Sequence, residues 1–89
     1  MNNYLVSFPV EKKHNQETVT NLRKKLEKHS PDHWIEILPN QMAIKSTLSI
    51  KELAEFLQPE SDDIRTTIVC FDEWHVYQAI EPEMKARDY

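Results

Sequence analysis

The chain contains no glycine in its 89 residues. Glycine reaches positive φ without steric cost, and its lack of a side chain lets a backbone approach a phosphate closely. Phosphate-binding loops and dinucleotide-binding fingerprints depend on both properties. The sequence therefore excludes a P-loop nucleotide hydrolase and a Rossmann oxidoreductase, and its turns must be built from other residues.

A chain of 89 residues has surface enough for one hydrophobic core, so we expect a single domain over residues 1–89. Its composition, 39% hydrophobic and 29% charged, is that of a folded protein and lacks the signature of disorder. No run approaches the roughly 18 apolar residues of a membrane span, and the N-terminus lacks the features of a signal peptide. We therefore predict a cytoplasmic protein that does not enter a membrane.

Four short segments have the apolar, β-forming pattern of strands. The first is apolar on both faces, which predicts a central strand. Pro39-Asn40 separates the second and third as a hairpin, with Asn40 expected at positive φ. The fourth contains the only cysteine, Cys70, which we expect to be a buried, small hydrophobic residue. The segments are residues 3–8, 33–38, 41–45 and 65–71.

Two segments between the strands have the period of an amphipathic helix. In the first, apolar residues recur from Val19 onward at i, i+3 and i+7, and Asn15 is the expected N-cap. In the second, Ser49 and Glu52 have the spacing of a capping box. The predicted helices cover about residues 15–29 and 50–58, and Pro31 and Pro59 are expected to end them.

The resulting order, β-α-β-β-α-β, predicts an α+β fold of the ferredoxin-like type. This fold has a four-stranded antiparallel sheet with both helices on one face. Such a sheet leaves its other face uncovered, so we expect a homodimer or another partner there. Trp74-His75-Val76-Tyr77 alternates in the manner of a strand, and we expect it to add to a sheet edge of the same chain or of a partner.

Charge is divided along the chain, which carries −4 overall. Residues 1–48 sum to +2, residues 49–83 to −7 and residues 84–89 to +1. An acidic second half argues against general affinity for nucleic acid, and it favours either a basic protein partner or simple solubility. The expected acidic face comprises Glu52, Glu55, Glu60, Asp62, Asp63, Asp72 and Glu73.

A resemblance to a known family rests on Tyr4-Leu5-Val6-Ser7-Phe8, His33-Trp34, the helix begun by Ser49, and Ile68 to Phe71 followed by Trp74. In these motifs the chain resembles small bacterial SinR-like proteins, which are unrelated to the helix-turn-helix repressor of that name. Those proteins are similar in turn to the small, dimeric, ferredoxin-like subunit of the CRISPR adaptation complex. The resemblance covers most of the chain and implies a setting near CRISPR adaptation, mobile elements or toxin–antitoxin loci.

The resemblance also implies where a nuclease site would lie. Members of the CRISPR subunit family that cut nucleic acid hold a divalent metal with an Asp at the end of the first strand, one from each protomer. Here Pro9 stands at that position, and a proline side chain has no ligand atom. Glu11, two residues further on, is the nearest carboxylate that would compensate, with Asp72 and Glu73 as other candidates.

Other polar groups have weaker signals. His29 and His33 have the i, i+4 spacing of a helical metal pair, but Pro31 between them should break the helix. Asp72, Glu73 and His75 can act as metal ligands or as an acid and base, although carboxylates at a strand end are more often solvated. No serine lies in a nucleophile-elbow motif, which argues against a serine hydrolase.

Two sets of side chains are candidates for binding. Trp34 suits core or dimer-interface packing, whereas Trp74 and Tyr77, in the acidic tail, are expected to contact a partner. A basic stripe on the first helix can contact phosphate or can simply be a solvated face. The stripe comprises Arg23, Lys24, Lys25 and Lys28.

We therefore predict a non-catalytic interaction protein that recognises a protein partner through its surface, including an acidic face that imitates nucleic acid. No cofactor, metal or catalytic residue is predicted. One alternative is a metal-dependent nuclease that uses a displaced carboxylate. The other is a subunit that binds duplex nucleic acid through the first helix without cutting it.

Overall fold

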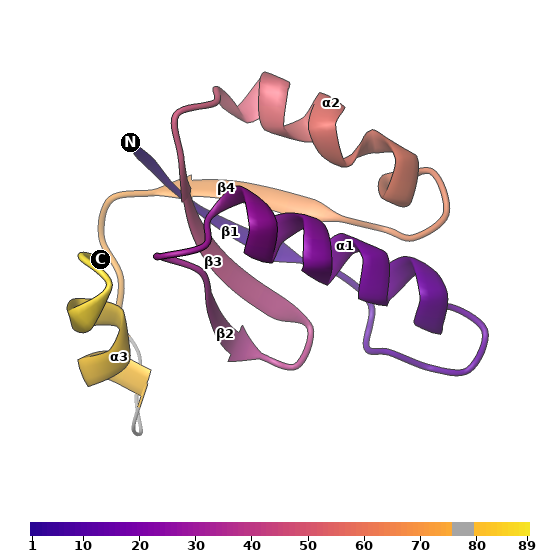
Figure 1. Cartoon of the computed structure of the whole chain (residues 1–89), viewed down its shortest axis with the longest axis horizontal. Helices are drawn as coiled ribbons and strands as arrows, with labels where there is room; N and C mark the ends of the chain where they lie inside the picture. The colour runs from indigo at the N-terminus through magenta and orange to yellow at the C-terminus, as the bar shows by residue number, and fades with distance from the viewer. Residues whose placement is uncertain (76–79) are drawn as a thin grey trace.

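The structure, a computed structural model, describes residues 1–75 and 80–89. Its four strands form one antiparallel sheet in the order β2-β3-β1-β4, with α1 and α2 on one face (Figure 1). The predicted α+β fold of the ferredoxin-like type, with β1 as a central strand, is thereby confirmed. The elements are β1 (Asn2–Ser7), α1 (Gln16–His29), β2 (Ile35–Leu38), β3 (Gln41–Ser46), α2 (Ile50–Ser61), β4 (Thr67–Phe71) and α3 (Ile80–Ala86).

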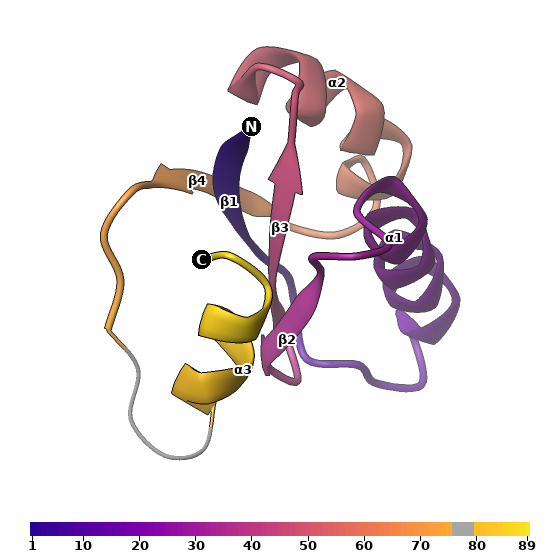
Figure 2. The same ribbon diagram turned by 60° about the vertical axis from the view of Figure 1, so that its left-hand side comes forward.

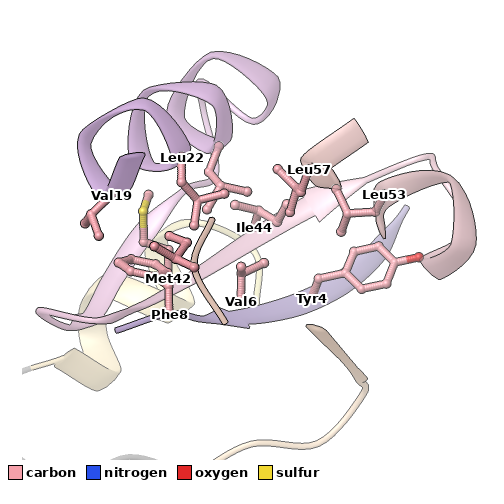
Figure 3. Close-up of a cluster of buried hydrophobic side chains, with 11 residues drawn as sticks. Tyr4, Val6, Phe8, Val19, Leu22, Met42, Ile44, Leu53 and Leu57 are labelled. Carbon is pink, nitrogen blue, oxygen red and sulfur yellow. The ribbon is translucent and has the colours of Figure 1, made fainter. Parts of the chain in front are cut away.

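The main core lies between the sheet and helices α1 and α2. Side chains alternate between the two faces of a strand, so every second residue of β1 and β3 points toward the helices. The helices meet them with the apolar stripes that their sequence period predicts (Figure 3). The buried cluster comprises Tyr4, Val6, Phe8, Val19, Leu22, Leu26, Met42, Ile44, Leu53, Leu57 and Ile64.

The opposite face of the sheet is partly covered by α3, a helix that the sequence patterns did not predict. Met84 of α3 is fully buried against Ile35 of β2 and Ala43 of β3, and Figure 2 shows α3 beside β2. The expectation of a wholly uncovered face was therefore wrong. Trp74 and His75 of the expected additional strand have no strand structure, and Val76 and Tyr77 lie outside the described residues.

The chain ends in a Schellman motif that holds its last residue against the sheet. The N–H of Tyr89 donates to the carbonyl of Met84, and the N–H of Asp88 donates to that of Lys85. Asp88 takes the left-handed conformation, φ 66°, that glycine usually supplies at this position. The motif directs the Tyr89 ring onto Phe71, with the ring centroids 6.0 Å apart.

The helix caps differ in part from their predicted form. The capping box of α2 is confirmed: Ser49 Oγ accepts from the N–H of Glu52, and the Glu52 carboxylate accepts from the N–H of Ser49. Asn15 precedes α1 as predicted, but its side chain does not cap the helix. Instead its Oδ1 accepts from the N–H of Lys12 at 2.7 Å and its Nδ2 donates to the carbonyl of Val10, which holds the loop after β1.

Three local expectations were wrong. Pro59 lies inside α2, because in the last turn of an exposed helix a proline removes only one hydrogen bond and water can take its place. Asn40 is not at positive φ, since a turn led by Pro39 and preceded by a bulge in β2 does not need it. Cys70 is exposed because β4 is an edge strand.

Candidate functional site

A pocket of about 320 Å³ lies on the α3 face of the sheet. Leu5, Ala43 and Val69 form its floor, one from each of β1, β3 and β4. These three residues are neighbours across the sheet, because Leu5 pairs with both Ala43 and Val69. The sides and rim are formed by Ile37, Gln41, Phe71, Glu73, Trp74, His75 and Met84.

The pocket is open because it lies on the part of the sheet face that α3 does not cover. The helix packs beside β2. Strand β4 is at the opposite edge of the sheet from β2 (Figure 2). Val69, at the β4 side of the floor, keeps 48% of its surface exposed. An apolar floor that is open at Val69 and lies beside Trp74 and Met84 can accept an apolar side chain from another molecule.

Trp74 therefore lines an apolar pocket. Its ring is partly buried against the second cluster and lines the pocket. Trp34, by contrast, packs against the main core on the other side of the sheet, so the structure gives the two tryptophans different environments. Tyr77, the second aromatic residue expected to contact a partner, lies outside the described residues.

The predicted acidic residues do not lie together on one surface. Asp62 and Asp63 precede β4, at the end where Thr67 pairs with Ser7. Asp72 and Glu73 follow β4, beyond the pairing of Phe71 with Asn3. The strand, about 13 Å long, separates the two pairs, and Glu52 and Glu55 lie on α2.

Glu60 and Lys25 are engaged with each other. Their side chains form an ion pair of 2.8 Å between α1 and α2, and Lys25 Nζ also donates to the carbonyl of Phe56. The same ammonium group lies 4.9 Å from the centroid of the Phe56 ring. These groups join the two helices and are not available to a partner.

The basic stripe is divided in the same way. Arg23 binds the Glu36 carboxylate and the Pro39 carbonyl, so it ties α1 to the hairpin. Lys24 and Lys28 are exposed one turn apart on the outer side of α1. Of the four residues in the predicted stripe, only Lys24 and Lys28 lie where they could contact a phosphate of another molecule.

The candidate carboxylates for a metal lie at opposite ends of the sheet. Glu11 follows the C-terminal end of β1 and accepts a hydrogen bond from Thr20 Oγ1 at 3.1 Å. Asp72 and Glu73 lie near the N-terminal end of β1. Within residues 1–75 and 80–89, no three His, Cys, Asp or Glu side chains gather in a geometry that would hold a metal ion.

His29 and His33 are separated by the end of α1, as the proline between them predicts. His29 Nε2 lies 2.6 Å from Ser46 Oγ, and its ring packs against Phe56. Ser46 Oγ also accepts from the N–H of Leu48. The histidine is thereby a structural link between α1 and the end of β3.

Sequence reasoning missed the side chains that α3 brings to the open face. Burial raises the pKa of the Tyr89 hydroxyl well above its ordinary value, and its oxygen has no hydrogen-bond partner among the described residues. Lys45 Nζ lies 4.7 Å from the centroid of the same ring. The i, i+4 ion pairs Glu81–Lys85 and Glu83–Arg87 are the signal that would have indicated a helix here.

No protein-family model matches the chain, and comparisons with curated proteins and with solved structures find no significant match. None of the helices in the described residues has both the length and the apolar character that crossing a bilayer requires.

Proposed function

We propose that the protein is a non-catalytic interaction protein that binds an apolar side chain of a protein partner in the pocket on the α3 face. The observation that carries the proposal is the floor of Leu5, Ala43 and Val69, which is apolar and only partly covered. Trp74 at the side of this floor supplies a large, amphipathic contact surface of the kind that dominates binding energy at interfaces.

Charge next to the pocket defines the partner further. Asp72 and Glu73 are exposed directly after β4, and Glu73 is on the pocket rim. Lysine or arginine beside the inserted side chain would complement these carboxylates. The proposed ligand is therefore a short segment with an aliphatic or aromatic residue flanked by basic ones.

The resemblance to SinR-like proteins supports a cytoplasmic setting related to CRISPR adaptation, mobile elements or toxin–antitoxin loci. The separated positions of Asp62–Asp63 and Asp72–Glu73 favour the pocket, rather than a continuous phosphate-like face, as the main contact. The distance of Glu11 from Asp72 and Glu73 likewise disfavours a shared metal site and with it the nuclease alternative.

Selection of binders from a random peptide library tests the proposal. We expect enrichment of an apolar residue flanked by Lys or Arg, and NMR shift changes at Leu5, Val69 and Trp74 when such a peptide is added. Trp74→Ala should weaken binding by tenfold or more, as expected for an aromatic anchor. The control Val10→Ala removes an exposed apolar side chain from the loop after β1, away from the pocket, and should leave binding unchanged.

Peptides that bind Trp74→Ala as well as the wild type would contradict the pocket as the binding site. The second candidate, binding of duplex nucleic acid, is favoured by the exposed Lys24 and Lys28. It predicts an affinity that falls steeply with salt and that is lost in Lys24→Ala/Lys28→Ala. That result, with no peptide selected, would replace the proposal.

A further inference from the structure

Strand β4 is an open edge of the sheet. Among residues 1–75 and 80–89 it has a neighbouring strand, β1, on one side only (Figures 1 and 2). Natural edge strands are usually protected by charge, proline or a bulge. The residues Thr67–Phe71 have no charge and no proline, and the pairing of β4 with β1 is regular.

The other edge of the sheet is protected. Strand β2 has only four residues, carries Glu36 and contains an irregularity between Glu36 and Leu38. Met84 of α3 also packs on Ile35 of that strand. The fold therefore blunts one edge and leaves the edge of β4 available.

We propose that a second copy of this chain pairs antiparallel with β4 about a two-fold axis at Val69, so that the two sheets become one of eight strands. A two-fold axis perpendicular to the sheet keeps the α3 faces of both copies on the same side, so residues that pair must point to the same face. Successive residues of a strand point to opposite faces, so the axis must pass through a residue and not between two residues. The possible centres in the middle of β4 are Ile68, Val69 and Cys70.

Charge complementarity selects Val69. Arg65 lies two residues before β4, and Glu73 lies two residues after it, beyond a bend at Asp72. In this register Arg65 comes next to Asp72 and Glu73 of the second copy at the ends of the paired strands, and the symmetry makes the same contact twice. Thr67 then lies opposite Phe71 of the second copy. Opposite charges across paired strands stabilise the pairing, and they also fix its register.

The two neighbouring registers are less favourable. Centring on Ile68 places Arg65 opposite Phe71 of the second copy, so that the cation faces an aromatic ring instead of a carboxylate. Centring on Cys70 places Asp72 opposite Ile68, whose side chain packs against the main core. That register sets a carboxylate beside apolar surface without a cation.

The groups that this pairing requires are accessible. Arg65 and Glu73 are both exposed, and neither forms an ion pair with any other residue in the described part of the chain. Helix α2 does not close the edge, because a groove of about 350 Å³ separates it from β4. That groove is lined in part by Ala54, Gln58, Thr66 and Ile68.

The pairing does not depend on the proposed function, since β4 can pair whether or not the pocket binds a partner. It does affect the pocket, because Val69 belongs both to the floor and to the two-fold axis. Arg65 of the second copy would also share the carboxylates of Asp72 and Glu73 with a basic residue of the ligand, so dimerisation should reduce the preference for Lys or Arg in the bound peptide. The pockets of the two copies would adjoin at that residue on one side of the eight-stranded sheet. A bivalent partner would then bind with an avidity that a single pocket does not provide.

Charge exchange tests the register. Sedimentation equilibrium of the full chain should show a dimer that Arg65→Glu and Glu73→Arg each weaken by about tenfold. The double variant Arg65→Glu/Glu73→Arg should recover the wild-type affinity because it restores the pair in reverse. The control Lys28→Glu makes the same charge change on the outer side of α1 and should not alter the dimer.

Disulfide formation tests the geometry without relying on charge. Residues directly opposite in antiparallel strands have Cα atoms about 4.5–5.5 Å apart, within the range that a disulfide spans. Val69→Cys in a Cys70→Ser background should therefore give a covalent dimer on mild oxidation. Thr67→Cys in the same background should not, because the two copies of residue 67 lie about 13 Å apart along the strand.

A monomer at every concentration would overturn the proposal. So would a dimer that forms a disulfide through Thr67→Cys and not through Val69→Cys, or a dimer unaffected by Arg65→Glu. Peptide binding by the pocket is measured separately, so failure of the pairing and failure of the proposed function are distinguishable.

Discussion

At the scale of single residues, the first turn of α2 contains the clearest electrostatic link between sequence and stability. The Ser49 N–H donates to the Glu52 carboxylate. Hydrogen bonding to Ser49, first through this backbone N–H and then through the Ser49 side chain, lowers the pKa of the Glu52 carboxyl below its ordinary value of 4.5. The carboxylate also lies at the positive end of the helix dipole. Both interactions favour its charged form.

This coupling predicts a dependence of stability on pH. Because the folded-state pKa is the lower one, the stabilisation is fully present above about pH 4.5 and is lost as the pH falls through the folded pKa. Glu52→Gln should therefore destabilise the protein at pH 7 and reduce the loss of stability between pH 5 and pH 3, measured by urea unfolding. The control Glu55→Gln lies outside the capping box, and an equal effect from it would contradict the assignment.

Residues whose role depends on short sequence spacing were predictable, and those whose role depends on distant partners were not. Ser49 and Glu52 form their capping box as predicted, since their partners are each other's backbone groups. Asn15 was placed correctly, yet its side chain binds Val10 and Lys12 in the preceding loop. Cys70 was predicted to be buried because its neighbours are apolar. It is exposed, because β4 is an edge strand, and apolar neighbours in the sequence do not reveal that position.

At the scale of elements, α3 is the one described helix that the sequence did not predict. Its seven residues are too few for a clear apolar stripe, and a helix of that length depends on packing for its stability. The packing comes from Met84 and, through the Schellman motif, from the Tyr89 ring. Trp74 was correctly singled out, but its pocket was not foreseeable without α3.

The buried hydroxyl of Tyr89 reduces the free energy with which α3 docks on the sheet. Its oxygen has no hydrogen-bond partner in the part of the chain that is described, so it loses its contact with water without compensation. Tyr89→Phe should strengthen the docking by about 1 kcal/mol. Slower hydrogen exchange at the amides of Asp88 and Tyr89, which close the Schellman motif, would be the measured sign.

Tyr89→Ala provides the opposite comparison, because it removes the ring that stacks on Phe71 along with the hydroxyl. Exchange at the same amides should then become faster than in the wild type. If Tyr89→Phe and Tyr89→Ala accelerate exchange alike, the hydroxyl contributes favourably and the account of its burial is wrong.

At the scale of the whole molecule, the sheet separates two clusters of very different size. The eleven buried residues of the main core come from β1, β3, α1 and α2 and from segments beside them, and none comes from α3. The second cluster has three buried residues, of which Met84 alone belongs to α3. The fold was predictable because the main core produces the strong periodic patterns, whereas the cover on the second face depends on one short helix.

This division predicts that α3 can detach without unfolding the sheet. Met84→Ala removes the central contact of α3, and burial of such a side chain is worth about 2–5 kcal/mol. The measured loss in global stability should be smaller, because it cannot exceed the free energy with which α3 docks. Leu53→Ala, in the main core, should show the full loss of about 2–5 kcal/mol in urea unfolding.

Tryptophan fluorescence distinguishes local detachment from global unfolding, since Trp74 packs with the second cluster and Trp34 with the main core. In a Trp34→Phe background, Met84→Ala should make Trp74 more accessible to acrylamide, while far-ultraviolet circular dichroism changes little. In a Trp74→Phe background, the same substitution should leave quenching of Trp34 unchanged. Equal exposure of both tryptophans would mean that the two faces of the sheet unfold together and that α3 is an integral part of the fold.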